Sequence, residues 1–189
     1  MKILKALMII LVTLNLTSCM TAATTAVVGG GLLYERKTVE QVVADQHIRS
    51  EIINAYFDNG TLWEQNRVIV SCVNGYVLLM GEVGSPQLKQ TAITLAQQVG
   101  GVVRVYDEIA IGTPVSIFQQ MKDAFITIVI KTKMLGAADF SPSNVKVITN
   151  NNIVYLMGVV DPKQADRAAD IASHTASVQK VVKVFQYIT

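Results

Sequence analysis

The sequence predicts an α+β fold built from two tandem copies of one module, each with the element order α-β-β-α-β. Two observations carry this prediction. The segment 68–83, rich in β-branched and other apolar residues, matches 145–160 at a constant offset of 77. The last predicted strand of each copy is also introduced by the same five-residue pattern, at 101–105 and 177–181. The pattern is a small residue, Val, any residue, a basic residue and Val. We therefore expect, in each module, a small three-stranded sheet with two helices on one face.

The leading helix of each module is predicted by apolar residues at helical spacing. In both copies an aspartate is followed three and seven residues later by isoleucine, from Asp45 and from Asp123 at an offset of 78. At about 100° per residue these positions share one side of a helix, which should cover the sheet. The residues aligned on this side are Ile48, Ile52 and Tyr56 in the first copy and Ile126, Ile130 and Met134 in the second.

The remaining elements follow from turn and helix-start residues. Asn74-Gly75 and Asn151-Asn152 tolerate a positive φ and separate two β-branched runs, which predicts a two-stranded hairpin in each copy. Pro86 and Pro162 then fit the first turn of a helix, where the missing N–H costs little. A last strand begins after each of these helices.

The N-terminus has the pattern of a lipoprotein export signal. Lys2 and Lys5 precede a short apolar run that ends in Leu16-Thr17-Ser18-Cys19, a lipobox, and the run is too short to span a bilayer. We expect residues 1–18 to be removed and Cys19 to carry a diacylglycerol and a palmitate-type acyl chain, with no other cofactor. A plain secretory signal or a membrane anchor that happens to contain a cysteine is the alternative.

The expected domain order is a lipidated N-terminus and flexible tether at 19–38, a first domain at 39–112 and a second at 113–189. The tether residues are small, apolar or hydroxylic, without helical or strand periodicity. Met20, next to the lipidated cysteine, lacks the aspartate linked to inner-membrane retention, which favours the periplasmic face of the outer membrane.

Composition argues against several classes of function. Without residues 1–18 the chain has fourteen basic and fourteen acidic residues, so nucleic acid is not an expected partner. The two cysteines leave no intramolecular disulfide once Cys19 is lipidated, and Cys72 falls in a strand, where a buried, inert thiol is expected. His47 and His174 lack a catalytic partner by spacing, and no metal-ligand pattern is present. We expect a protein that is not an enzyme.

The repeated blocks resemble the BON domain, and the order of lipobox, tether and two copies resembles the dual-BON outer-membrane lipoproteins. The resemblance rests on Val-Leu-Leu-Met-Gly at 77–81, Val-Tyr-Leu-Met-Gly at 154–158, the shared entry to the last strand, and Ala-Asp-Ile-Ala-Ser at 169–173. It implies a non-enzymatic periplasmic module that associates with phospholipid membranes and supports envelope integrity. Ser177, where the first copy has Gly101, is a small departure at a turn.

The two copies differ in charge and on the outer side of the leading helix. Residues 39–112 have a net charge of −4 and residues 113–189 a net charge of +3. The outer positions of the second leading helix are mostly apolar, whereas their first-copy counterparts include His47, Ser50 and Asn54. An apolar side flanked by lysines favours insertion at an anionic phospholipid surface. The expected phospholipid-binding residues are Met121, Lys122, Phe125, Ile128, Lys131, Lys133 and Leu135.

Two alternatives for this surface stay open. It could bind an outer-membrane assembly or cell-division protein, so that the chain acts as an interaction scaffold. It could also pack against the first module or the tether, with Phe125 and Ile128 at the contact. The sequence does not place the two modules relative to each other.

Overall fold

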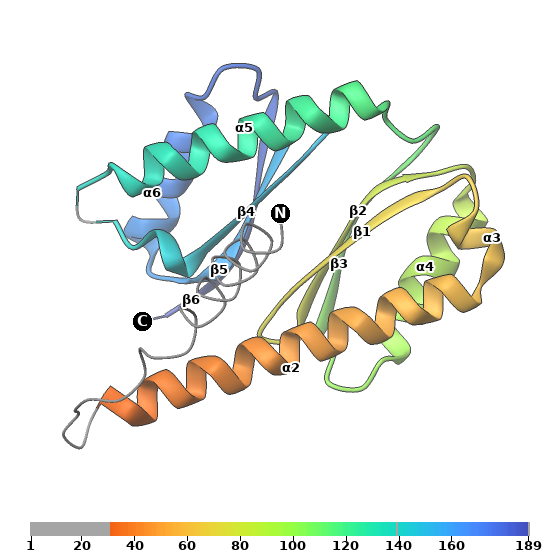
Figure 1. Ribbon diagram of the computed structural model, residues 1–189, viewed down its shortest axis with the longest axis horizontal. Helices are drawn as coiled ribbons and strands as arrows, with labels where there is room; N and C mark the ends of the chain where they lie inside the picture. Colours follow the sequence, from red (N-terminus) through yellow and green to blue (C-terminus); the bar gives the residue numbers. More distant parts are fainter. Residues whose placement is uncertain (1–30, 139, 189) are drawn as a thin grey trace, which may run out of the picture. The chain divides into compact units, whose positions relative to one another are not determined.

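The structure is a computed structural model that describes residues 31–138 and 140–188, and it contains the two predicted α-β-β-α-β modules (Figure 1). The first module comprises α2 (Gly31–Asp58), the short α3 (Gly60–Trp63), β1 (Arg67–Val73), β2 (Tyr76–Val83), α4 (Pro86–Gln98) and β3 (Arg104–Ile111). The second comprises α5 (Ile117–Leu135), the 3-10 turn η1 (Pro142–Asn144), β4 (Val145–Asn150), β5 (Ile153–Val160), α6 (Pro162–Ser173) and β6 (Lys180–Tyr187). The α+β prediction is confirmed.

The start of the first helix differs from the prediction. Helix α2 begins at Gly31, so residues 31–38, which we expected in the flexible tether, are helical. This stretch is free of proline and rich in Leu, Glu, Arg and Lys, which favour a helix. Val39–Thr189 forms one compact unit that contains both modules. The predicted signal peptide 1–18, Cys19 and the tether as far as residue 30 lie outside the described residues.

Both sheets have the same topology. The middle strand pairs antiparallel with the first strand of its module and parallel with the last, giving the orders β1-β2-β3 and β4-β5-β6. A parallel pair needs a crossover connection, and α4 and α6 supply it. Pro86 and Pro162 stand in the first turns of these helices, after the N-caps Ser85 and Asp161.

The hairpin turns also form as predicted, and each is held by the aspartate of the leading helix. Asn74 and Gly75 have φ of 52° and 73°, and Asn151 and Asn152 have 49° and 61°, as a two-residue turn of the mirror-image type requires. The Asp45 carboxylate accepts hydrogen bonds from both N–H groups of the first turn, each at 2.9 Å. Asp123 accepts the corresponding pair in the second module at 2.8 and 2.9 Å.

Each module has a core between its helices and one face of its sheet. The predicted helix positions are buried here: Ile48, Ile52 and Tyr56 beside β1 and β2, and Ile126, Ile130 and Met134 beside β4 and β5. From the middle strands, Val77 and Leu79 contribute to the first core and Val154 and Leu156 to the second. Both helices of a module therefore cover the same face of its sheet.

A third core lies between the two sheets. Leu78 and Met80 of β2 pack with Tyr155 and Met157 of β5 and Val184 of β6, and all five are buried. Since side chains alternate across a strand, β2 and β5 are buried on both faces, which explains their nearly continuous apolar sequences. The modules thus meet through the sheet faces that their helices leave open.

Candidate functional site

An exposed apolar surface follows one side of α5. Its side chains recur at helical spacing along the whole helix, and each is more than half exposed although large and apolar. We call this surface the α5 face. It comprises Ile117, Phe118, Met121, Phe125, Ile128 and Leu135, with exposed fractions of 76, 79, 66, 66, 61 and 74%.

The opposite side of α5 fixes the orientation of this face. The helix begins after Ser116, whose hydroxyl accepts a hydrogen bond from the Gln119 N–H at 3.2 Å. Ile126, Ile130 and Met134 are at most 3% exposed in the second core. Burial of this side against the sheet turns the α5 face outward. The alternative in which Phe125 packs against the first module is wrong, because the modules meet through their sheets.

The three predicted lysines have different surroundings. At about 100° per residue, Lys131 lies on one side of the α5 face, and Lys122 and Lys133 lie on the other. The Lys133 ammonium group donates to the Thr175 hydroxyl at 3.0 Å and to the His174 carbonyl at 3.2 Å, beyond the end of α6. Lys122 and Lys131 are exposed and form no salt bridge or hydrogen bond within 31–138 and 140–188. They are therefore the more available cations.

The matching side of α2 in the first module has exposed apolar residues toward its ends, such as Val43 and Phe57, but polar residues at its centre. The positions that align with Phe125 and Ile128 are His47 and Ser50, both exposed and polar. The His47 imidazole lies 3.6 Å from the Glu51 carboxylate one turn later. Because both modules have the same fold, that fold does not require apolar residues at the positions of Phe125 and Ile128.

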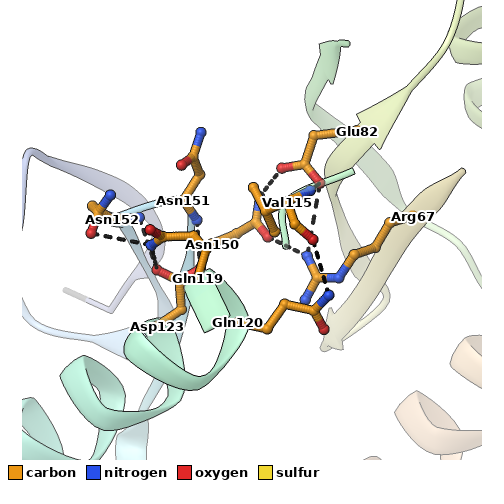
Figure 2. A network of polar contacts seen from close by, with 9 residues as sticks. All are labelled: Arg67, Glu82, Val115, Gln119, Gln120, Asp123, Asn150, Asn151 and Asn152. Atoms are coloured by element: carbon orange, nitrogen blue, oxygen red, sulfur yellow. Dashed lines mark hydrogen bonds and ion pairs between the residues drawn. The ribbon is translucent and has the colours of Figure 1, made fainter. Parts of the chain in front are cut away.

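A polar network ties the segment before α5 to the first module (Figure 2). Glu82, only 5% exposed, accepts a hydrogen bond from the Asn150 amide at 2.7 Å and one from the Val115 N–H at 3.4 Å. The Arg67 guanidinium lies 3.9 Å from the Glu82 carboxylate and donates to the Asn150 side-chain oxygen. One buried carboxylate thus connects β2, β4 and the segment leading into α5.

The first turn of α5 continues this network, as Figure 2 shows. Gln120 donates to the Val115 carbonyl at 3.2 Å. Gln119 donates to Asp123 at 2.9 Å and to the Asn152 side-chain oxygen at 3.2 Å. The N-terminal end of the α5 face is therefore held both by its own hairpin turn and by the first module.

The other reactive groups singled out in the sequence have structural surroundings. The Cys72 thiol is buried and donates to the Asp45 carboxylate at 3.3 Å. Burial, with the nearby negative charge of Asp45, raises the pKa of Cys72 to about 12; the predicted burial of this thiol is confirmed, and its inertness stays a prediction. His47 and His174 are highly exposed and lie in different modules, each near one carboxylate.

Neither a membrane span nor a metal cluster is found in the part of the chain that the structure describes. Over that part, no helix has both the length and the apolar character needed to cross a bilayer. Over the same residues, His, Cys, Asp and Glu side chains do not gather in groups of three or more that could hold a metal ion.

Two α-β-β-α-β modules with matching turns, matching glycines and an aspartate that holds each hairpin define a tandem repeat of one small domain. The BON domain family matches residues 44–113 and 122–189. The chain belongs to the BON domain family and contains two copies of the domain. The resemblance stated from the sequence is thereby confirmed.

Curated relatives include the outer membrane lipoprotein DolP of Haemophilus influenzae, 36% identical over 98% of this chain and 97% of the relative. A 21 kDa hemolysin of Actinobacillus pleuropneumoniae is 35% identical over 77% of this chain and 75% of its own. Osmotically-inducible protein Y of Escherichia coli is 32% identical over 72% and 69%. The first of these confirms the predicted class, an outer-membrane lipoprotein, whereas lipidation of Cys19 stays a prediction.

The sequence missed part of the candidate site. Ile117 and Phe118 extend the α5 face by one turn and are its most exposed residues, but the predicted set began at Met121. The same helical spacing, continued back to Ser116, would have included them. Glu82 and Asn150 gave no such signal, because their contact joins residues 68 positions apart in two modules.

Proposed function

We propose that this protein is a non-enzymatic outer-membrane lipoprotein that faces the periplasm, binds anionic phospholipid through α5 of its second BON domain and supports envelope integrity. Acylated Cys19 would hold the chain at the membrane, and the α5 face would hold the second module against the lipid surface. The observation that carries the proposal is the 66% exposure of Phe125 in the middle of an apolar helix side.

Apolar burial supports a membrane contact. Exposing a row of large apolar side chains to water is energetically unfavourable. Burying them in a binding partner removes this unfavourable contact with water. Inserting one such side chain into the lipid interface contributes roughly 1.5–3 kcal/mol. Several side chains of the α5 face would together hold the module at the surface, and the shape of an amphipathic helix lying in the interface suits this role.

Charge favours lipid as the partner. The second module has a net charge of +3, and Lys122 and Lys131 border the α5 face without a salt bridge among the described residues. A lysine near an anionic leaflet contributes about 1 kcal/mol, and that contribution falls with ionic strength. The first module has a net charge of −4, so an anionic lipid surface would repel it.

Vesicle flotation of residues 20–189, which lack the cysteine to be acylated, tests the proposal. We expect the chain to float with vesicles that contain phosphatidylglycerol and to remain in solution with phosphatidylcholine alone. Phe125→Glu should reduce binding roughly 10-fold or more, from the lost apolar burial and the added charge. His47→Glu is the matched control, because His47 occupies the same position of the first module, and it should float like the unmodified chain.

Three results would contradict the proposal: equal binding to both kinds of vesicle, unchanged flotation of Phe125→Glu, or equal loss in Phe125→Glu and His47→Glu. A partner protein on the same face would give flotation that is insensitive to Phe125. The Lys122→Gln and Lys131→Gln double variant should weaken flotation most at low salt, because its loss is electrostatic.

A further inference from the structure

A groove of about 740 Å³ opens between α2 and β1 of the first module and α5, η1 and β4 of the second. Its volume lies within the roughly 300–1,000 Å³ typical of small-molecule sites. The walls are mainly apolar. Val42 and Val73 line it from the first module, and Met134, Val145 and Met157 line it from the second.

Two lysines give the groove a positive charge. Lys131 and Lys146 both line it. In the register of β4 with β5, Lys146 stands opposite Met157, so its side chain lies on the sheet face turned toward the first module. Neither lysine forms a salt bridge or a hydrogen bond with any residue that the structure describes. The groove thus combines apolar walls with unpaired cations.

The acidic residue of the lining, Asp45, is already engaged. Its carboxylate accepts hydrogen bonds from the Asn74 and Gly75 N–H groups and from the Cys72 thiol. Partial desolvation lowers the pKa of Lys146, and the nearby positive charges of Arg49 and Lys131 lower it further, against the opposing effects of Cys72 and Asp45. An anion placed between the lysines would relieve this repulsion.

We propose that the groove binds one anionic phospholipid molecule, with its phosphate beside Lys131 and Lys146 and one acyl chain along Val42, Val73 and Met157. The bilayer is its source, and in this respect the proposal rests on the proposed function. Lys131 borders the α5 face, and Leu135 belongs both to that face and to the groove lining. A lipid at the edge of the membrane-bound helix therefore has a short path into the groove.

Titration with a single-chain lipid below its critical micelle concentration tests the groove without a bilayer. We expect residues 20–189 to bind lysophosphatidylglycerol more tightly than lysophosphatidylcholine. Lys146→Gln should weaken binding of the anionic lipid about fivefold, the loss of one lysine near a phosphate. Val42→Glu, at an exposed position on the groove wall, should weaken it about tenfold or more.

Val43→Glu is the matched control for Val42→Glu. Val43 is the next residue of α2, is 62% exposed and does not line the groove, so binding should be unchanged. The proposal is overturned if both lysolipids bind equally, if Lys146→Gln and Val42→Glu bind like the unmodified chain, or if Val43→Glu loses as much as Val42→Glu.

Running both assays on both variants distinguishes lipid binding in the groove from membrane binding by the α5 face. Phe125→Glu should lose vesicle flotation and keep lysophosphatidylglycerol binding, whereas Val42→Glu should keep flotation and lose lysolipid binding. Loss of lysolipid binding in Phe125→Glu would assign the ligand to the α5 face and overturn the groove. If the unmodified chain fails to float but binds the anionic lysolipid in the groove, the membrane contact is wrong and the groove site is supported.

Discussion

Two glycines occupy equivalent positions of the middle strands, where both the backbone angle φ and the lack of space for a Cβ atom require glycine. Gly81 has φ of +112°, and a Cβ built there would lie 2.0 Å from the Arg67 carbonyl oxygen. Gly158 has the same relation to the Asn144 carbonyl oxygen, also at 2.0 Å. The repeated Met-Gly pair of the sequence therefore marks a place where two backbones come too close for any side chain.

Gly81→Ala should lower the free energy of unfolding by about 2–4 kcal/mol, because the strand must shift and the new residue is strained at a positive φ. The measurement is the urea midpoint of residues 20–189. Gly84→Ala is the control, since a Cβ there meets only the Asn66 side-chain oxygen at 3.8 Å, and its midpoint should change little. Equal midpoints for the two variants would refute the steric explanation.

Cys72 should resist thiol reagents in the folded protein. Its raised pKa of about 12, against the usual value near 9, leaves little thiolate at pH 8, and the residue is only 4% exposed. In residues 20–189, where Cys72 is the single cysteine, reaction with an aromatic disulfide reagent should be at least about 100-fold slower in buffer than in urea. Similar rates in both solvents would mean that the thiol is accessible.

The same thiol predicts a pH dependence of stability. Because the folded state raises the pKa of Cys72, the unfolded chain releases the proton first as the pH rises above about 9. The free energy of unfolding should then fall with pH, by up to about 1.4 kcal/mol per unit. Cys72→Ala should remove this slope between pH 8 and 10, and an identical slope in both proteins would assign it to other groups.

At the scale of elements, the tie between the leading helix and the hairpin turn recurs in both modules. Asp123 is only 3% exposed, and its two oxygens accept the N–H groups of Asn151 and Asn152. Asp123→Asn replaces one acceptor by an amide donor, which faces a backbone N–H. We expect a loss of about 1–3 kcal/mol in the free energy of unfolding, seen as a lower thermal midpoint. Asp166→Asn, at an exposed position of α6, should leave the midpoint nearly unchanged.

Much at this scale could be predicted from the sequence. Helical spacing identified the buried side of α5, and alignment of the two copies identified the exposed side with Phe125 at its centre. The role of Asp45 and Asp123 could not be read in the same way. Their recurrence was visible, but their partners are backbone N–H groups 28–30 residues further along the chain, which have no sequence signature.

At the scale of the whole molecule, the contact between sheets joins the two modules in one compact unit. Leu78 is fully buried in that contact, and Val184 is 7% exposed there from the other module. We expect the unmodified chain to unfold in one transition. Leu78→Asp should place a charge in the contact, cost roughly 2–5 kcal/mol, and split unfolding into two transitions.

Two controls keep this prediction testable even if Leu78→Asp unfolds its own module. Val184→Asp should separate the transitions from the other side, and exposed Gln97→Asp should leave a single transition. Amide resonances should show the unmutated module still folded in each contact variant. A single, uniformly lowered transition in both would mean that the modules remain coupled without the sheet contact.

The arrangement of the modules was the part that the sequence did not predict. Val-Leu-Leu-Met and Val-Tyr-Leu-Met have apolar residues on both faces of a strand, a pattern that indicates a sheet covered on both sides. It does not say what covers the second face, since another module, a second copy or a helix would give the same pattern. The Glu82 network depends on that arrangement and was therefore equally invisible.

Sheet-to-sheet packing also separates charge across the molecule. The module on one side of the contact has a net charge of −4 and the module on the other side +3, so the unit carries an electric dipole across the contact. Near an anionic bilayer the surface potential exerts a torque on such a dipole within about one Debye length, roughly 10 Å at 0.1 M salt. The protein would be turned with α5 toward the lipid before any side chain touches it, and salt would slow this approach.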